Sequence, residues 1–290
     1  MSRPQELRPE GFDPVRTKEI EDSLRKNKRF HRTLFSRFAK AINSYELIQP
    51  GDKIAVCISG GKDSMLMAKL MQLYQPLSPV PFEVRYLIMD PGYHERNRQK
   101  VESNAQLLEI PYTLYESDIF AIANHQEKNP CFLCAKMRRG CLYARAQEMG
   151  CNKIALGHHF DDVIETTVMA MFYGAQLQAM PPILDSRNFP GMQLIRPLYM
   201  LREEEIIRWA GENGLSFIQC ACRFTEEAEL HGGEGHLSKR KETKQLLREL
   251  RETHPNVEQN IFDAIHHVDL DAVLEWKTQG KRHTFLERES

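Results

Sequence analysis

The residues best suited to chemistry stand in one short stretch, Lys53–Ser64, which reads KIAVCISGGKDS. An apolar run ends there at two adjacent glycines, Gly60 and Gly61, and polar residues suited to opening a helix follow. The pattern predicts a strand, a tight turn and the N-terminus of a helix. Because glycine has no Cβ, the backbone can bend sharply at the turn, and its N–H groups can approach an anion closely.

The polar side chains of this stretch indicate which anion it binds. Ser59, Lys62 and Ser64 add two hydroxyls and an ammonium at a helix N-terminus, where the helix dipole also favours negative charge. We therefore predict a phosphate site, with Lys62 acting on phosphate and Asp63 on a metal ion. The alternative is a plain Gly-Gly turn, which does not call for these four polar residues together. The adjacent glycines also exclude a Walker A loop, in which four residues separate the glycines.

The six residues Ser59–Ser64 resemble the SGGxDS loop of the PP-loop ATP pyrophosphatases. These enzymes hold the β- and γ-phosphates of ATP and cleave between the α- and β-phosphates. The resemblance implies the adenine nucleotide alpha hydrolase-like fold, with ATP and Mg²⁺ as cofactors. It also implies that a substrate is adenylated and that pyrophosphate is released.

Beyond the loop, strand patterns and helix patterns alternate. The predicted strands and helices, in chain order, are Phe82–Asp90, Glu95–Leu108, Tyr112–Glu116, Leu133–Met149, Lys153–Gly157 and Asp161–Tyr173. Such alternation predicts an α/β fold, a doubly wound parallel sheet with helices on both faces. In such folds the ligand binds at the carboxyl ends of the strands.

Two further groups of polar residues follow predicted strands at that edge of the sheet. Asp90 ends one strand, and the sequence GHHFDD, residues 157–162, ends another. We expect Asp90, Gly157 and His158 to contact the nucleotide. Asp162 is a candidate catalytic residue, because its carboxylate could hold Mg²⁺ or position the polyphosphate. The alternatives are a turn or helix cap for Asp90, and a helix cap formed by Asp161 with the histidines filling a loop.

The cysteines point to a metal or a redox site. Seven cysteines, an odd number without an evident export signal, argue against a disulfide framework. Cys131 and Cys134 form a CxxC pair, and Cys220 and Cys222 form a later CxC pair. A metal bound to both pairs would hold the later segment against the sheet. Three thiolates suit an iron–sulfur cluster with one open iron, and four suit tetrahedral zinc. A reversible dithiol or a zinc site at the first pair is a further alternative. The other cysteines are interpreted as packing residues: Cys57, Cys141 and Cys151.

Several motifs in the same order narrow the resemblance. The motif GHHFDD, the helix ending in MFYG, Met180-Pro181-Pro182 and Ile195-Arg196-Pro197-Leu198 resemble the PP-loop subgroup that thiolates tRNA, the tRNA 2-thiocytidine synthetases. By that resemblance, Cys131, Cys134 and Cys220 ligate a [4Fe-4S] cluster. The chain departs from the family pattern at its second pair, which is CxC and not CxxC. Cys222 therefore stays open between a spare thiol, a fourth ligand and a persulfide carrier.

The resemblance implies ATP-dependent thiolation of tRNA, with cytidine converted to 2-thiocytidine in the anticodon loop. The implied partners are tRNA and a sulfur donor such as a cysteine desulfurase, and a homodimer is compatible with it. Two alternatives stay open. One is another PP-loop ligase that acts on a different nucleoside or small molecule. The other is a non-enzymatic nucleotide-binding sensor with an iron–sulfur or zinc site.

Two basic segments could contact RNA. The stretch Arg25–Lys40 carries basic residues and no acid, while Phe30, Leu34 and Phe38 recur at every fourth position, which predicts an amphipathic helix. Its basic face is either solvated or a contact surface for phosphates, and the absence of acids favours RNA. The second basic segment, Lys136–Arg139, follows the CxxC pair directly.

Composition sets the outer limits of these interpretations. The net charge of -1 gives no global attraction to nucleic acid, so any basic surface must be local. No apolar run has the length of a membrane span and no signal-peptide pattern is evident, which favours a cytoplasmic protein without a membrane partner. We predict a polar, extended or loosely attached leader over residues 1–24, a basic helix over 25–45, a PP-loop domain over 46–223 and a helical segment over 224–290. That last segment is predicted to hold a connector at Thr225–Gly235, a helix from Ser238 and a helix at Val257–Val268.

Overall fold

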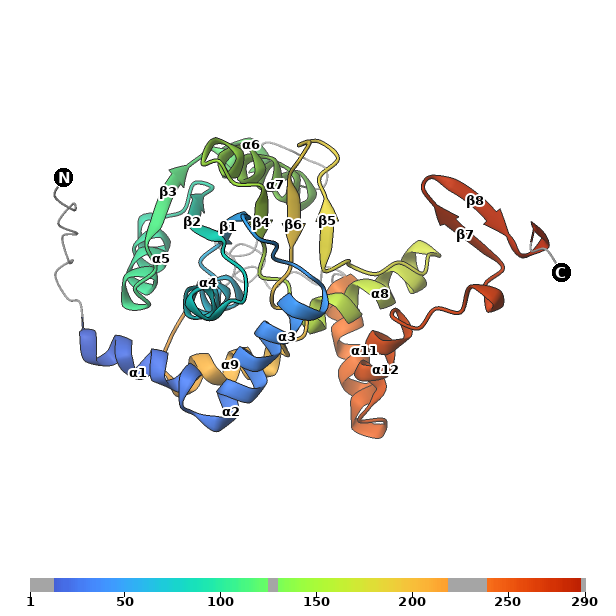
Figure 1. Cartoon of the computed structure of the whole chain (residues 1–290), viewed down its shortest axis with the longest axis horizontal. Coiled ribbons are helices and arrows are strands. Elements are labelled where there is room, and N and C mark those ends of the chain that lie inside the picture. The colour runs from blue at the N-terminus through green and yellow to red at the C-terminus, as the bar shows by residue number, and fades with distance from the viewer. Residues whose placement is uncertain (1–12, 125–129, 219–238, 288–290) are drawn as a thin grey trace. The chain divides into compact units, whose positions relative to one another are not determined.

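The computed structural model describes residues 13–124, 130–218 and 239–287 (Figure 1). The chain divides into two compact units, one formed by residues 1–162 and 181–236 and the other by residues 163–180 and 237–290. The predicted connector at 225–235 lies outside the described residues. Among the helices that are described, none is long and apolar enough to cross a membrane.

The first unit is built on a six-stranded sheet with the order β3-β2-β1-β4-β6-β5. Its strands are β1 Lys53–Ile58, β2 Glu83–Asp90, β3 Tyr112–Glu116, β4 Lys153–Ala155, β5 Ile183–Asp185 and β6 Gln193–Ile195. All neighbouring strands run parallel except β5, which pairs with β6 in the antiparallel direction at one edge. The predicted α/β fold is confirmed, with the antiparallel edge strand as an addition.

Helices cover both faces of this sheet, as a doubly wound fold requires. The helices of this unit after β1 are α4 Lys62–Tyr74, α5 Glu95–Leu107, α6 Ile119–Asn124, α7 Pro130–Glu148, the first turn of α8 Phe160–Gly174, and α9 Glu203–Glu212. Alternate residues of β1 pack on opposite faces. Ile54 and Val56 belong to the core cluster that includes α4, whereas Ala55 and Cys57 pack with Tyr143 of α7. This double burial explains the continuous apolar run before the loop.

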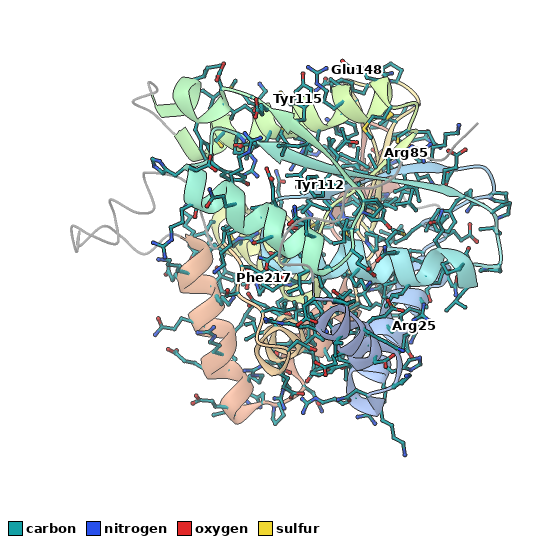
Figure 2. All side chains as sticks on the ribbon, turned by 90° about the vertical axis from the view of Figure 1, so that its left-hand side faces the viewer. Arg25, Arg85, Tyr112, Tyr115, Glu148 and Phe217 are labelled. Atoms are coloured by element: carbon teal, nitrogen blue, oxygen red, sulfur yellow. The ribbon has the colours of Figure 1, made fainter. Side chains whose placement is uncertain are left out.

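Helix α7 is anchored to the edge strand β3 by a cation. The guanidinium carbon of Arg145 lies 3.6 Å from the ring centroid of Tyr115, and the same guanidinium pairs with Glu148. Figure 2 labels Tyr115 and Glu148 at the top of the molecule in that view. The helix that begins with the CxxC pair is therefore fixed to the sheet near its C-terminal end.

The predicted extended leader is wrong over its described part. Helix α1, Pro14–Arg25, begins after Asp13, whose side chain accepts hydrogen bonds from two backbone N–H groups of its first turn. Ile20 and Leu24 are buried on its inner face, and Glu21 pairs at 3.2 Å with the buried ammonium of Lys69 on α4. A short apolar stripe and one long-range ion pair therefore attach this polar segment to the first unit.

The predicted basic helix forms, with an irregular centre. It consists of α2 Lys28–Phe30, a π-helical turn at His31–Phe35, and α3 Ser36–Ser44. The apolar positions Phe30, Leu34 and Phe38 are fully buried in the main core, as the spacing predicts.

One of its basic residues has a structural role. The side chain of Arg29 donates two hydrogen bonds to the carboxylate of Glu205 on α9, at 3.0 and 2.5 Å, and Thr33 donates a third at 3.0 Å. Arg32, Arg37 and Lys40 are exposed. Arg29 therefore belongs to the packing of this helix on α9, and only the exposed cations remain candidates for RNA contacts.

The second unit contains the rest of α8 with α11 Lys239–Thr253, α12 Val257–Ala264 and a hairpin of β7 Glu275–Thr278 and β8 Lys281–Thr284. Arg240 of α11 pairs with Glu165 of α8 at 3.5 Å, and Arg251 pairs with Glu258 of α12 at 3.6 Å. The two predicted C-terminal helices are confirmed. The predicted helical segment also contains a hairpin after these helices, and Trp276 stacks on His283 across it.

We predict that Arg29→Ala lowers the midpoint of thermal unfolding, because it leaves the buried Glu205 carboxylate without its guanidinium. Hydrogen bonds from Arg29 hold the pKa of Glu205 below its ordinary value of 4.5. The stability gained from the pair is therefore fully present above pH 4.5 and is lost as the pH falls further. The difference in midpoint between wild type and Arg29→Ala should disappear in acid. Arg32→Ala, at an exposed position of the same helix, is the matched control, and an equal loss of stability in both variants would contradict this role.

Candidate active site

The glycine turn after β1 depends on Gly60. Gly60 has a φ of +82°, and a Cβ there would lie 2.4 Å from Cγ2 of Val101 and 2.7 Å from Cδ1 of Ile218. Gly61 has a φ of −77° and is the N-cap of α4, and a Cβ there would meet nothing closer than 3.8 Å. The first glycine is therefore needed for both conformation and space, whereas the second leaves the helix N-terminus open.

The two serines of the loop have different roles. The Ser64 hydroxyl is buried, accepts hydrogen bonds from the Ser59 backbone N–H and hydroxyl at 3.1 Å each, and donates to the carbonyl oxygen of Gly61 at 3.0 Å. It closes the loop on itself. Ser59 is exposed, so its hydroxyl can reach a ligand.

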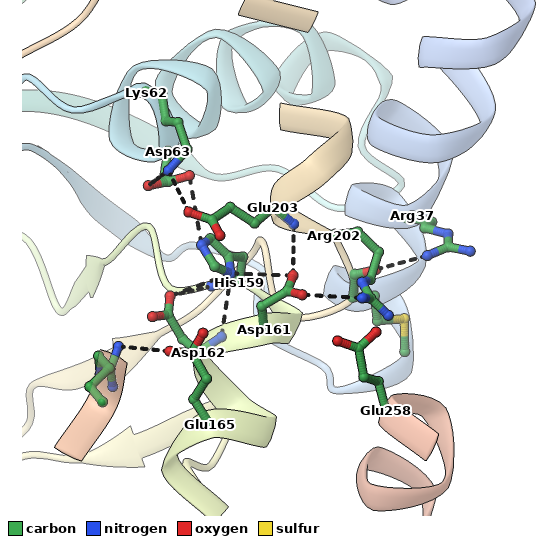
Figure 3. Close-up of polar contacts among 12 residues, drawn as sticks. Arg37, Lys62, Asp63, His159, Asp161, Asp162, Glu165, Arg202, Glu203 and Glu258 are labelled. Carbon is green, nitrogen blue, oxygen red and sulfur yellow. Dashed lines mark hydrogen bonds and ion pairs between the residues drawn. The ribbon is translucent and has the colours of Figure 1, made fainter. Parts of the chain in front are cut away.

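The ammonium of Lys62 is held by two carboxylates. Its Nζ lies 3.1 Å from Oδ2 of Asp63 and 3.0 Å from Oε1 of Glu203 (Figure 3). Burial alone would lower the pKa of Lys62, but the charges of Asp63 and Glu203 outweigh it and raise this pKa. Lys62 therefore carries its charge at neutral pH, as the predicted contact with phosphate requires.

His159 lies among three carboxylates at the same edge. Its Nε2 is 3.8 Å from Oδ1 of Asp63, and its Nδ1 is 3.7 Å from Asp161 and 3.6 Å from Asp162 (Figure 3). His159 and Asp162 also cap the N-terminus of α8 reciprocally, because the His159 N–H donates to Asp162 at 3.1 Å and the Asp162 N–H donates to His159 Nδ1 at 3.4 Å. Asp162, the predicted catalytic residue, is therefore positioned through its own helix cap.

Asp161 has a role that the sequence did not reveal. Its Oδ2 accepts a hydrogen bond from the Glu203 N–H at 2.7 Å, and its Oδ1 pairs with Arg202 at 3.3 Å. Asp161 therefore caps α9 and not its own helix, and it fixes Glu203 beside Lys62. Glu203 and Arg202 were missed. The acidic run at the start of α9 was the available signal, because carboxylates gather at helix N-termini.

Gly157 allows β4 and α4 to approach each other. A Cβ at Gly157 would lie 3.1 Å from the backbone nitrogen of Ser64 and 3.2 Å from the carbonyl carbon of Asp63. The end of β4 therefore contacts the backbone of the phosphate loop. The half-buried His158 follows directly, which brings both predicted residues to the edge where the loop lies.

Asp90 lies at this edge too, but its carboxylate is engaged in a turn. Oδ1 accepts hydrogen bonds from the backbone N–H groups of Gly92 at 2.8 Å and Tyr93 at 2.6 Å, and Oδ2 lies 3.9 Å from Arg98. This is the turn-cap alternative raised by the sequence. A contact between Asp90 and the nucleotide stays a prediction.

The CxxC pair lies at the start of helix α7. Cys134 is half-buried; the side chain of Cys131 and the whole of Cys220 and Cys222 lie outside what the structure describes. Among the described residues, no group of three or more His, Cys, Asp or Glu side chains is arranged so that it could hold a metal ion by itself. One contact links α7 to the phosphate loop, because the Tyr93 hydroxyl donates to the Ser59 carbonyl oxygen at 2.9 Å and accepts from Arg138 at 3.5 Å.

Two other cysteines match the packing role predicted for them. Cys57 and Cys151 are buried in the core between the sheet and α7. Burial raises the pKa of both thiols, which keeps them protonated and unreactive.

The residues present fit ATP and Mg²⁺. Lys62 and the open N-terminus of α4 suit a polyphosphate. Within the described part of the chain, Oδ1 of Asp63 is buried and accepts no hydrogen bond, which suits a ligand of a hard cation. The first strand of the sheet, β1, ends in this loop. The neighbouring strand β4 is followed by Asp161 and Asp162, which we call the acidic cluster. This arrangement defines a PP-loop nucleotide-binding domain.

Comparisons with known proteins agree with this class. A family model described as a PP-loop domain matches residues 30–222. The chain is 35% identical over 243 residues to a tRNA-cytidine(32) 2-sulfurtransferase of Anaeromyxobacter sp. (strain K), covering 83% of this chain and 80% of that protein. It is 38% identical over 234 residues to the protein of the same name from Alkalilimnicola ehrlichii, covering 79% and 70%.

A solved structure, the U34-tRNA thiolase NcsA from Methanococcus maripaludis with its [4Fe-4S] cluster, shares the fold with a TM-score of 0.60 at 23% identity, covering 81% of this chain and 79% of that one. The chain therefore belongs to the PP-loop family, among the tRNA-cytidine(32) 2-sulfurtransferases.

We predict that Gly157→Ala weakens nucleotide binding by about tenfold or more, because the new methyl group crowds backbone atoms of the loop, which must shift by a few tenths of an ångström. Isothermal titration with a non-hydrolysable ATP analogue measures the loss. Gly211→Ala on α9 is the matched control, since a Cβ there meets nothing within 4 Å. Unchanged ATP affinity in Gly157→Ala would show that the contact between β4 and the loop is not needed.

Proposed function

We propose that this protein is an ATP-dependent tRNA thiolase that converts a cytidine to 2-thiocytidine. The observation that supports this most is a charged Lys62 at the open N-terminus of α4, in a chain related to tRNA-cytidine(32) 2-sulfurtransferases. The loop carries out the activation step, and the cysteines would hold the iron–sulfur group that serves sulfur transfer.

The chemistry explains why ATP is needed. The C2 oxygen of a pyrimidine is a poor leaving group. Attack of this oxygen on the α-phosphorus of ATP forms a C2–O–AMP bond and releases pyrophosphate. A sulfur nucleophile then attacks C2, the C2–O bond breaks, and AMP leaves with the oxygen.

Several of the described residues would take part in the first step, the adenylation of the C2 oxygen. Lys62 and the N–H groups of the loop bind the phosphates and stabilise the charge that develops when pyrophosphate leaves. Asp63 and Asp162 would hold Mg²⁺, which neutralises phosphate charge when bound. Glu203 keeps Lys62 charged and oriented until the phosphates replace it as a partner.

For the second step, we assign Cys131, Cys134 and Cys220 as ligands of a [4Fe-4S] cluster. When bound, such a cluster supplies an open iron that can hold sulfur. The sulfur comes from a donor such as a cysteine desulfurase. Because the persulfide sulfur of such a donor is more oxidised than the sulfur of the product, a thiol reductant must supply two electrons in the transfer. The reaction belongs in the cytoplasm with its tRNA substrate. Exposed basic residues of the two basic segments, such as Arg32 and Lys136, are candidates for contacts with tRNA phosphates.

Pyrophosphate release with and without tRNA separates this function from its rivals. We expect release to require tRNA, and Lys62→Ala to slow it by about a hundredfold or more, because one electrostatic donor at a transition state contributes on that scale. Lys53→Ala, at the opposite end of β1, is the matched control. Release that needs no tRNA would indicate another PP-loop ligase, and ATP binding without cleavage would indicate a sensor. Mass spectrometry of tRNA nucleosides from a deletion strain then identifies the product.

We predict that serine at Cys131, Cys134 or Cys220 removes iron and thiolation activity from anaerobically purified protein while ATP affinity is retained. The reason is that the thiols and the phosphate loop belong to different segments. Cys222→Ser decides between two metal sites: full iron content and activity indicate three ligands. If the wild-type protein contains zinc and no iron, and Cys222→Ser loses this zinc, the metal site is a four-cysteine zinc site and not an iron–sulfur cluster.

A further inference from the structure

Arg196 is a buried cation without a carboxylate partner among the described residues. It directly follows β6, and its side chain is 5% exposed. One guanidinium nitrogen donates to the carbonyl oxygen of Pro181, and its Nε is buried with no hydrogen-bond partner in the described ranges. Since a guanidinium carries five N–H donors, one backbone oxygen leaves most of its capacity unused.

Other buried cations of this unit have carboxylate partners. Lys153, 2% exposed, pairs with Asp52 at 2.7 Å, and Lys69, 1% exposed, pairs with Glu21 at 3.2 Å. Burying a charge without such a partner costs free energy. Arg196 therefore differs from the structural cations of the same fold.

A second cation, Arg139 of α7, interacts electrostatically with Arg196. Burial and the positive charge of Arg139 on α7 together lower the pKa of Arg196 to about 10, although Tyr199, Tyr143 and Asp162 act in the opposite direction. Arg139 is exposed. Two guanidinium groups that repel each other would both be stabilised by an anion bound between them.

The position of Arg196 indicates which anion fits. It stands at the carboxyl end of β6, the strand next to β4, and its electrostatic neighbours belong to the acidic cluster, Asp162, and to the helix of the CxxC pair, Arg139 and Tyr143. Both substrates of the proposed reaction, ATP and tRNA, carry phosphate. Arginine forks bind phosphate oxygens in a bidentate manner.

We propose that Arg196 and Arg139 together bind a phosphate group of a substrate, beside the acidic cluster and α7. The inference rests on the proposed function, which makes ATP and tRNA the two sources of phosphate. If the phosphate belongs to the adenylate, the pair holds AMP while sulfur attacks. If it belongs to the RNA backbone, the pair positions the target nucleotide near the thiols of α7.

Two variants test the site. Arg196→Lys keeps the charge and removes the fork, and Arg139→Gln changes an exposed side chain, so it tests the site even if Arg196→Lys does not fold. Arg85→Gln is the control, because Arg85 is exposed and pairs with Glu83 on β2. For each variant, the affinities for AMP and a non-hydrolysable ATP analogue are measured without tRNA, and the affinity for tRNA is measured without nucleotide.

We expect one of these affinities to fall by about tenfold or more in both variants and to stay unchanged in Arg85→Gln. A fall for AMP and the ATP analogue assigns the phosphate to the nucleotide, and a fall for tRNA assigns it to the RNA backbone. Unchanged affinities, an equal fall in the control, or a loss of iron alone would overturn the proposal. Assaying wild-type protein for 2-thiocytidine separately distinguishes a failure of the proposed function from a failure of this site.

Discussion

The functional edge of the sheet depends on the backbone contact between the end of β4 and the first turn of α4. Because Gly157 has no Cβ, the two segments can approach each other closely. This contact brings His159 within 3.8 Å of Asp63 and places the acidic cluster beside the phosphate loop. Asp161 extends the arrangement to a third element, because it caps α9 and fixes Glu203 on Lys62. Residues from three separate segments thus form one site.

The charge of this site is set before any substrate binds. Asp63 and Glu203 keep the ammonium of Lys62 protonated, while Ser64 closes the loop that precedes α4. A polyphosphate therefore meets an ammonium that is already charged and N–H groups that are already oriented, which lowers the cost of arranging them during the reaction. The same principle applies to Arg196. Its buried guanidinium is already in place for an anion, and it has no carboxylate partner among the described residues.

Local patterns predicted the strands, the crossover helices and the loop, because each depends on the periodicity and turn chemistry of a few neighbouring residues. What the sequence could not show were contacts between distant residues. From its sequence neighbours Arg29 is predicted to be a basic surface residue, but in the structure it pairs with Glu205. The segment of α1 is predicted to be a leader, because its attachment depends on the distant ion pair between Glu21 and Lys69. The roles of Asp161 and Glu203 likewise depend on where α8 and α9 begin in space.

The central claim is that the loop activates the C2 oxygen of cytidine as an adenylate, so that this oxygen leaves in AMP. The direct measurement is a single turnover with tRNA that carries ¹⁸O at the C2 oxygen of the target cytidine, followed by mass spectrometry of the AMP. The account predicts one ¹⁸O atom in AMP for each 2-thiocytidine formed. Unlabelled AMP, with the label released to water or retained in the RNA, would contradict it.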